Sequence, residues 1–210
     1  MSKFLKLSTV RAMGKAVAFH GYKSSPENID WLIAPLREAG FKVVTPVIRD
    51  VDDGYEEGLK ELPADVVAGH SMGGTVALLL AARNPGSVKC VIAVASPVDR
   101  RLQLQYLLQS EDPYLKKLAN NLASLGNKLE QTSPSRFIGN GMPPVLYIRG
   151  SEDRVVPRTH VDILAGLSDR FNFPLEVVEI EGMAHSPQRE GHVAVVADAV
   201  KKFVAKYCAP

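Results

Sequence analysis

The 210-residue sequence contains only two cysteines, Cys90 inside an apolar run and Cys208 near the C-terminus. Two thiols in these positions do not make the disulfide framework that is typical of a small secreted domain. The sequence therefore favours a protein from a reducing compartment, in which Cys90 is only a small buried side chain.

Long apolar runs are also missing. The longest, TVALLLAA, covers residues 75–82 and is far shorter than the roughly 20 residues that span a bilayer, so we expect no membrane span. The N-terminal segment MSKFLKLSTVRAMGK is basic, and the first acidic residue is Glu27, which is a weak feature of transit peptides. No continuous apolar segment or cleavage site follows it, and we expect a cytoplasmic location.

The sequence has no large excess of charge of one sign. Lysine and arginine total 25, aspartate and glutamate total 23, and the formal net charge is +2. The basic residues are scattered, so the sequence does not predict nucleic acid as a partner. The length predicts one domain, residues 1–210, with a core that needs no cross-links.

Short apolar runs alternate with amphipathic segments along the chain. The apolar runs predict strands at residues 16–21, 41–48, 65–69, 90–96, 144–150 and 175–182. Most are continuous runs of Val, Ile and Leu, as expected for strands that are covered on both faces. The amphipathic segments predict helices at residues 25–40, 71–86, 157–167 and 191–207. This alternation predicts an α/β fold, with a mostly parallel sheet and helices on both faces.

Residues 97–143 break the alternation. They contain no convincing strand but two leucine-rich helical patterns, one at residues 100–109 and one from residue 114 to residue 125. A long insertion in a compact domain is often functional, so this helical insertion could be a small lid, with residues 98–130 lining an apolar acyl pocket. The same helices could simply cover the sheet, and the sequence leaves both interpretations open.

The motif Gly-His-Ser-Met-Gly occupies residues 69–73, between a predicted strand and a predicted helix. A sharp strand-to-helix turn would lift Ser71 above the sheet edge, and the flanking glycines avoid clashes of Cβ atoms. The helix N-terminus would favour negative charge that develops there. The motif alone is weak evidence, because Ser71 could merely cap the helix. A serine nucleophile also needs a base and an orienting acid.

Two candidate partners of Ser71 follow predicted strands. Asp153 comes shortly after the run at 144–150, and His185 comes shortly after the run at 175–182. Both lie beyond the C-terminal ends of their strands, where open α/β sheets bind ligands. The order serine, aspartate, histidine is the one associated with this turn.

The other four histidines are weaker candidates for the base. His160 and His192 lie within helical patterns, which predicts surface or packing roles. His70 flanks Ser71 but is expected to point away from it. His20 follows the first predicted strand, where an oxyanion loop would be needed.

Taken in order, these motifs resemble the α/β-hydrolase family. The resemblance covers about residues 16–205 and rests on HGY (20–22), GHSMGG (69–74), PVLYIRGSEDRVVP (144–157) and GMAH (182–185). It implies that Ser71 is the nucleophile, that His185 is the general base and acid, and that Asp153 orients His185. It also implies an oxyanion hole formed by the backbone N–H groups of Tyr22 and Met72, and no metal or organic cofactor.

The chain departs from the family pattern in two places. There is little room before residue 16 for the family's first two strands, so we expect a reduced sheet of six or seven strands. The insertion at 97–143 is short for a full cap domain, so the substrate preference of relatives does not carry over.

Three carboxylates are candidates for the acid of the triad. Some α/β-hydrolases place this acid after the earlier strand, which would select Asp99 in ASPVDR. We prefer Asp153, because GSEDRVVP matches the family loop with the acid three residues after Gly150. Two arginines follow Asp99, which suits an ion-paired or helix N-terminal residue, and Glu152 is expected to point to solvent.

The expected reaction is hydrolysis of a carboxylic ester of a small or medium acyl substrate. In this mechanism His185 takes the proton of Ser71, two N–H groups hold the oxyanion, and water cleaves the acyl-enzyme. Serine at the turn argues against dehalogenases and epoxide hydrolases, whose relatives carry aspartate there. Thioesterase, peptidase, acyltransferase and C–C bond hydrolase activities stay open, as does a low-turnover binding protein or receptor. The oligomeric state stays unknown.

Overall fold

A computed structural model of the chain describes residues 14–208. Its centre is a six-stranded sheet in the order β2-β1-β3-β4-β5-β6, and every neighbouring pair of strands is parallel. The strands are β1 (Gly14–Phe19), β2 (Phe41–Val44), β3 (Ala64–His70), β4 (Val88–Val94), β5 (Val145–Gly150) and β6 (Leu175–Ile180). The predicted parallel α/β sheet is confirmed, at the lower of the two strand numbers expected.

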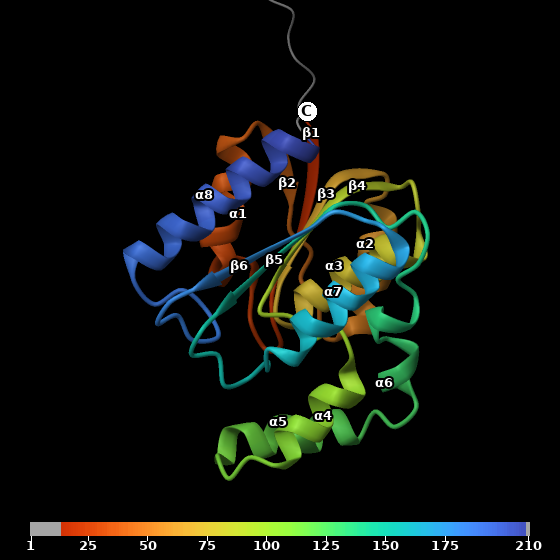
Figure 1. Cartoon of the computed structure of the whole chain (residues 1–210), viewed down its shortest axis with the longest axis vertical. Helices are drawn as coiled ribbons and strands as arrows, with labels where there is room; N and C mark the ends of the chain where they lie inside the picture. The colour runs from red at the N-terminus through yellow and green to blue at the C-terminus, as the bar shows by residue number, and fades with distance from the viewer. Residues whose placement is uncertain (1–13, 209–210) are drawn as a thin grey trace, which may run out of the picture.

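Helices cover both faces of the sheet (Figure 1). The helices on one face are α1 (Asp30–Glu38), which follows the short 3-10 helix η1 (Pro26–Ile29), and α8 (Glu190–Tyr207). The helices on the other face are α2 (Val51–Lys60), α3 (Met72–Arg83) and α7 (Thr159–Phe171). In residues 14–208, no helix has both the length and the apolar character needed to cross a bilayer. Residues 1–13 of the basic N-terminal segment lie outside the described residues.

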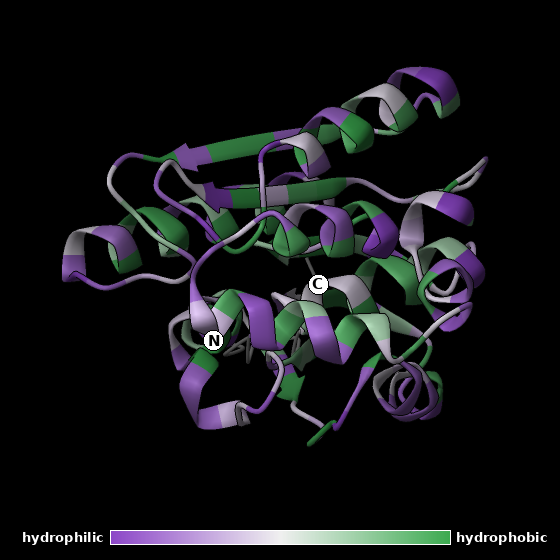
Figure 2. Ribbon diagram, turned by 90° about the horizontal axis from the view of Figure 1, so that it is seen from below, coloured by the Kyte–Doolittle hydropathy of each residue, from purple (hydrophilic) through white to green (hydrophobic). Residues whose placement is uncertain are grey.

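The strands read as continuous apolar runs because both of their faces are buried. In β1, Val17 and Phe19 point into the core on the α3 side, and Ala16 and Ala18 point into the core on the α8 side. All four side chains are fully buried. In Figure 2 the bodies of the strands are mostly hydrophobic in colour, and hydrophilic residues lie at some strand ends and along the helices and loops.

Helix α2 was not predicted from the sequence. Its buried face is made by Val51 and two glycines, so the segment lacks the apolar periodicity of an amphipathic helix. A Cβ atom on Gly58 would lie 2.3 Å from Leu80 Cδ1, so the glycines let α2 approach α3 closely. The helix begins where the side chain of Asp50 accepts a hydrogen bond of 2.8 Å from the backbone N–H of Asp53.

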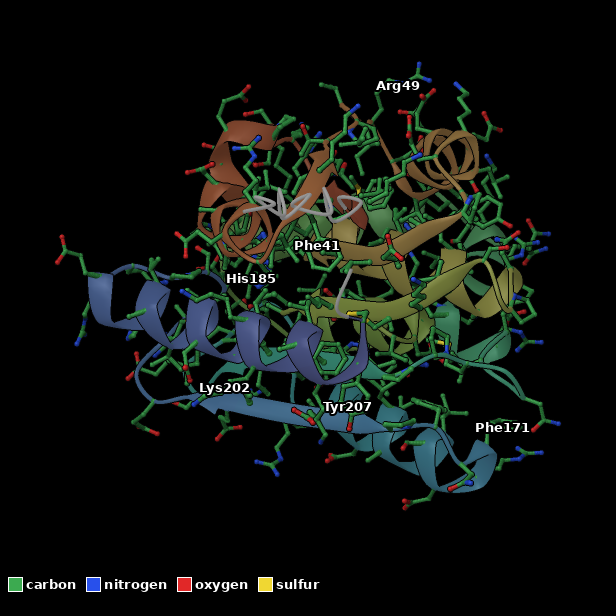
Figure 3. The ribbon with its side chains drawn as sticks, turned by 90° about the horizontal axis from the view of Figure 1, so that it is seen from above. Phe41, Arg49, Phe171, His185, Lys202 and Tyr207 are labelled. Atoms are coloured by element: carbon green, nitrogen blue, oxygen red, sulfur yellow. A yellow bond between two sulfur atoms is a disulfide. The ribbon has the colours of Figure 1, made fainter. Side chains whose placement is uncertain are left out.

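Cys90 and Cys208 form a disulfide, with Cα atoms 6.1 Å apart. The prediction that Cys90 is only a small buried side chain was therefore wrong. Helix α8 crosses the sheet and brings the C-terminal end of the chain back to β4, which a separation of 118 residues does not reveal. Figure 3 labels Tyr207, the last residue of α8. The bond also removes the argument that two unpaired thiols indicate a reducing compartment.

The insertion at 97–143 is helical, as predicted. It contains α4 (Arg100–Leu108), α5 (Pro113–Ala123), α6 (Lys128–Gln131) and the 3-10 helix η2 (Pro134–Arg136). Leu107, Leu115 and Ala119 form a small apolar cluster between α4 and α5, separate from the two cores beside the sheet. In Figure 1 these helices lie below the sheet, beyond the C-terminal ends of its strands.

Candidate active site

Ser71 occupies a sharp turn between β3 and α3. Its φ of 55° and ψ of −120° are rare for a residue with a side chain, and such strain is concentrated at functional sites. The Ser71 N–H donates a hydrogen bond of 2.8 Å to the carbonyl oxygen of Val94, which helps to hold this conformation. A Cβ atom on Gly69 would lie 2.2 Å from the carbonyl carbon of Gly73, so the turn needs glycine there.

The side chain of Ser71 does not cap α3. Its Oγ lies 2.9 Å from Nε2 of His185, and Nδ1 of His185 lies 3.0 and 3.2 Å from the carboxylate oxygens of Asp153. A carboxylate accepts hydrogen bonds, so Nδ1 carries the proton and Nε2 is free to accept the serine hydroxyl. The three residues predicted from the sequence therefore lie in one hydrogen-bonded chain.

The carboxyl group of Asp153 is held in its ionised form. Its side chain is fully buried, which alone raises the pKa. Hydrogen bonds from His185 and from the backbone N–H groups of Val155 (2.8 Å) and Val156 (3.1 Å) outweigh this effect and bring the pKa below its usual range. Asp153 is therefore negatively charged at neutral pH, beside the ring that would become positive.

The two alternative acids lie elsewhere. The carboxylate of Asp99 caps α4, accepting hydrogen bonds from the N–H groups of Arg101 (2.9 Å) and Leu102 (3.0 Å). It also accepts a hydrogen bond of 3.1 Å from the hydroxyl of Ser135. Glu152 is exposed, as expected. Of the three candidates, the one beside His185 is Asp153.

His70 contributes a contact that the sequence analysis missed. Its Nε2 donates a hydrogen bond of 2.8 Å to the backbone carbonyl oxygen of His185, and the two ring centroids are 4.9 Å apart. Burial, and then the nearby charge of His185, lower the pKa of His70 to about 4. The ring is therefore neutral at pH 7 and positions the loop that carries His185. Adjacency to Ser71 was the only signal of this role in the sequence.

His20 shapes the loop after β1. The side chain is buried, its Nδ1 donates a hydrogen bond of 2.8 Å to the carbonyl oxygen of Gly21, and its Nε2 accepts one of 3.1 Å from the N–H of Ile48. Because β1 pairs with β3, this loop lies next to the turn at Ser71. After β1 the chain forms β2 on one side of β1, and it then forms β3 on the other side. The strand order reverses here, and open α/β sheets bind ligands at this switch point.

His160 and His192 are both buried, which agrees with a packing role and not with a surface position. Nε2 of His160 donates a hydrogen bond of 2.9 Å to Oε1 of Gln103, and Nδ1 accepts one of 3.2 Å from the N–H of Val98. Burial lowers the pKa of His160 to about 4. His160 therefore joins α7 to the start of the helical insertion as a neutral ring.

A cavity of about 330 Å³ opens beside Ser71, at the lower end of the volume range of small-molecule sites. Met72 and Tyr22 also line this cavity. Its apolar wall includes four leucines of the insertion, Leu107, Leu118, Leu122 and Leu125. The insertion therefore covers the candidate site. Within the described part of the chain, no group of three or more His, Cys, Asp or Glu residues is placed to hold a metal ion.

Comparisons with known proteins place the chain among esterases. A family model described as "Putative esterase" matches residues 46–165, more than half of the chain. The matched part contains Ser71 and Asp153 but not His185. No curated protein matches the sequence.

Several solved structures share the fold at low sequence identity. Est1E from Butyrivibrio proteoclasticus is 19% identical with a TM-score of 0.69, over 92% of this chain and 87% of that one. Esterase 2 of Thermogutta terrifontis, phosphonylated by sarin, is 17% identical with a TM-score of 0.71, over 94% and 86%. A puromycin-hydrolyzing peptidase of Mycobacterium tuberculosis is 17% identical with a TM-score of 0.73, over 94% of this chain. The chain spans only 34% of that peptidase.

Proposed function

The chain belongs to the esterase family whose model matches residues 46–165, and we propose that it hydrolyses carboxylic esters of small or medium acyl groups with Ser71 as the nucleophile. The observation that carries this proposal is the hydrogen-bonded chain from Ser71 through His185 to Asp153. The strained backbone of Ser71 supports the proposal, because the Ser71 side chain does not cap α3 and the strain is therefore not explained by capping.

In the proposed acylation step, Nε2 of His185 takes the hydroxyl proton while Oγ of Ser71 attacks the ester carbon. The contact of 2.9 Å between these atoms is within the range for proton transfer. Asp153 keeps the proton on Nδ1 and stabilises the imidazolium. His185 then gives the proton to the leaving alcohol, and in the second half it activates the water that releases the acid.

The oxyanion hole is proposed to consist of the backbone N–H groups of Met72 and Tyr22. Met72 is the first residue of α3, so its N–H has no acceptor within the helix. Tyr22 follows β1, the strand beside β3, and both residues line the cavity next to Ser71. Two donors at this place would stabilise the oxyanion, and the removal of one such donor typically slows turnover by about 10²–10³-fold.

The leucines of the insertion are proposed to form the acyl pocket. We include in this proposal that the insertion, residues 97–143, acts as a small lid over the cavity. A cytoplasmic location and the absence of a nucleic-acid partner stay expectations from the sequence. The disulfide between Cys90 and Cys208 argues against the cytoplasmic location, because disulfides are rare in reducing compartments.

Other acyl-transfer reactions use the same triad. Thioesters, amides, acyl transfer to alcohols and C–C bond hydrolysis all pass through an equivalent oxyanion. One structural neighbour is titled a peptidase and others are titled esterases, and we favour esters because the family model names that activity. A binding protein that kept the triad would bind an ester without turning it over.

The proposal is tested by a fluorophosphonate probe together with hydrolysis of p-nitrophenyl butyrate. We expect stoichiometric labelling of Ser71, mapped by peptide mass, and a burst followed by steady turnover. Ser71→Ala should abolish both. Ser124→Ala is the matched control, because Ser124 also lines the cavity and its hydroxyl donates to a backbone carbonyl oxygen instead. Folded protein that neither labels nor turns over would refute the proposal.

A further inference from the structure

The cavity beside Ser71 contains a buried positive charge that the ester reaction does not require. Arg100, the first residue of α4, lines the cavity and is only 8% exposed. Its Nη1 donates a hydrogen bond to the hydroxyl oxygen of Thr132. Among residues 14–208 no carboxylate forms an ion pair with this guanidinium, although many exposed charges of the protein are paired.

The other arginines in comparable positions have carboxylate partners. Arg149 is equally buried and pairs with Glu179. Arg49 also lines the cavity, but its side chain is 84% exposed and it pairs with Asp53 at 2.6 Å. Figure 3 shows Arg49 at the outer edge of the molecule. Arg100 therefore differs from both in being buried and unpaired.

Arg100 has N–H donors for which the described residues supply no acceptor. A guanidinium has five N–H donors, and a buried charge without partners is strongly unfavourable. Over the described chain, the one fully enclosed side-chain nitrogen or oxygen that lacks a partner is Nδ1 of His192. The nitrogens of Arg100 without a hydrogen bond are therefore not fully enclosed by protein, and Arg100 is itself part of the cavity wall.

Two acidic residues, Asp50 and Asp52, act on Arg100 electrostatically but form no ion pair with it, and Asp50 also lines the cavity. Asp50 caps α2 by accepting a hydrogen bond from the N–H of Asp53, and Asp52 lies 3.4 Å from Nζ of Lys128. Burial lowers the pKa of Arg100 to about 10, against a smaller opposite effect of Asp52 and Asp50. The side chain is therefore still charged at neutral pH.

We propose that the natural ester carries an anionic group, joined to the ester by a short apolar chain, and that Arg100 binds this anion. The inference rests on the proposed function and narrows its substrate class. The planar guanidinium suits a carboxylate or a phosphate, both of which it can bind through two parallel hydrogen bonds. The apolar chain follows from the leucines that line the same cavity, such as Leu118 and Leu122.

Gln103 does not offer an equivalent polar contact, although it also lines the cavity. Its Oε1 accepts a hydrogen bond from His160, and its Nε2 donates one of 2.7 Å to the carbonyl oxygen of Val155. The amide thus keeps only one neutral N–H donor, which binds an anion more weakly than a guanidinium does. The specificity for an anion is therefore assigned to Arg100.

The test compares anionic esters with neutral esters of the same shape. In the acyl arm, mono-p-nitrophenyl adipate and suberate are compared with their methyl p-nitrophenyl diesters. In the alcohol arm, 4-acetoxybenzoate is compared with methyl 4-acetoxybenzoate, and 4-acetoxyphenyl phosphate with its dimethyl ester. We expect the wild type to prefer the anion in at least one arm, and Arg100→Gln to lower that preference by about 10- to 100-fold, the range of a charge-assisted hydrogen bond.

Two control variants locate the effect. Arg101→Gln removes the neighbouring arginine, which is exposed and pairs with Glu130, and it should leave the preference unchanged. Arg49→Gln removes the charge at the cavity surface, and a larger loss there than in Arg100→Gln would overturn the assignment to Arg100. Arg100→Lys should keep part of the preference, because it retains the charge but not the planar fork.

Failure of the inference and failure of the proposed function give different results. Hydrolysis of p-nitrophenyl butyrate without any preference for the anionic esters would overturn the inference alone. No hydrolysis of any ester by folded wild-type protein would overturn both. If Arg100→Gln does not fold, the wild type still decides: adipate should compete with p-nitrophenyl butyrate at least about tenfold better than adipamide, and equal inhibition constants would overturn the inference.

Discussion

The ring of His70 donates a hydrogen bond to the backbone carbonyl oxygen of His185, so the residue before the serine also fixes the loop of the base. Trp31 also packs against His70 in a T-shaped arrangement, with ring centroids 5.5 Å apart. The serine turn and the histidine loop come from segments 115 residues apart in the sequence. A single half-buried neutral side chain joins them.

Replacement of His70 should therefore slow the reaction without changing the reacting groups. We expect His70→Leu to lower kcat for p-nitrophenyl butyrate by about tenfold, the value of one hydrogen bond, with a much smaller change in KM. His70→Gln keeps a donor and should recover part of the loss. An unchanged kcat in His70→Leu would mean that the hydrogen bond does not position His185.

Substitution of the two candidate acids, Asp153 and Asp99, should have very different effects on kcat. Asp153→Asn should lower kcat by at least about two orders of magnitude, since the corresponding change in serine proteases costs roughly 10⁴-fold. Asp99→Asn should stay within about tenfold, because asparagine also caps helices. Steady-state kinetics with circular dichroism as a folding control decides between them. The reverse ranking in folded variants would identify Asp99 as the acid.

Acid should destabilise the protein through His160. Its folded-state pKa of about 4 lies below the ordinary value of 6.5, so between these pH values the unfolded chain binds the proton and the folded protein does not. The stabilising contribution is complete above about pH 6.5 and is lost as the pH falls toward 4. Burial causes the shift, which the charges of Asp99 and Asp153 oppose.

Denaturant unfolding at about pH 7 and about pH 4.5 measures this effect. The wild type should lose about 2–3 kcal/mol more stability on acidification than His160→Gln, which has no ring to protonate. The variant will be less stable at both pH values, so the comparison uses only the change with pH. The same change in both proteins would show that His160 does not contribute.

The leucines of the insertion should set the acyl chain length. We expect Leu118→Trp to lower kcat/KM for p-nitrophenyl octanoate relative to the acetate by at least about tenfold, because the larger side chain takes the space of the longer acyl chain, and overfilling a site costs roughly 1–3 kcal/mol. Leu108→Trp is the matched control, since Leu108 is 58% exposed and does not line the cavity. A similar change of chain-length preference in both variants would mean that Leu118 does not line the acyl pocket and that the insertion only covers the sheet.

Reduction of the disulfide should lower stability but not activity. Cys90 and Cys208 are separated by 118 residues, and a loop of this length gives about 4–5 kcal/mol by the chain-entropy model, with about 2–5 kcal/mol commonly observed. Dithiothreitol should therefore lower the midpoint of guanidinium unfolding of the wild type. It should not affect the double variant Cys90→Ala and Cys208→Ala. Equal sensitivity of both proteins would argue against the bond.

The sequence predicted the parts of the structure that depend on local pattern. The strands are continuous apolar runs because both of their faces are buried, and the serine turn needs glycines at fixed spacing, so both features are visible in one sequence. Asp153 and His185 followed because the topology of a parallel sheet brings the C-terminal ends of its strands together.

The features that the sequence did not predict depend on packing between distant segments. Helix α2 was not predicted because two of the three buried residues on its packing face are glycines, which give no apolar periodicity. The contact between His70 and His185, and the unpaired state of Arg100, require knowledge of which loops meet. Cys90 and Cys208 gave no spacing pattern, because their approach is set by the path of α8.

The disulfide also divides the catalytic groups topologically. It closes a covalent ring from Cys90 to Cys208, and Asp153, His185 and the helices of the insertion lie within this ring, while Ser71 lies outside it. A protease that cuts one bond of the ring, for example in the connection 109–112 between α4 and α5, would leave both pieces joined. The nicked protein would keep nucleophile, base and acid in one molecule, and only a reductant would release the fragments.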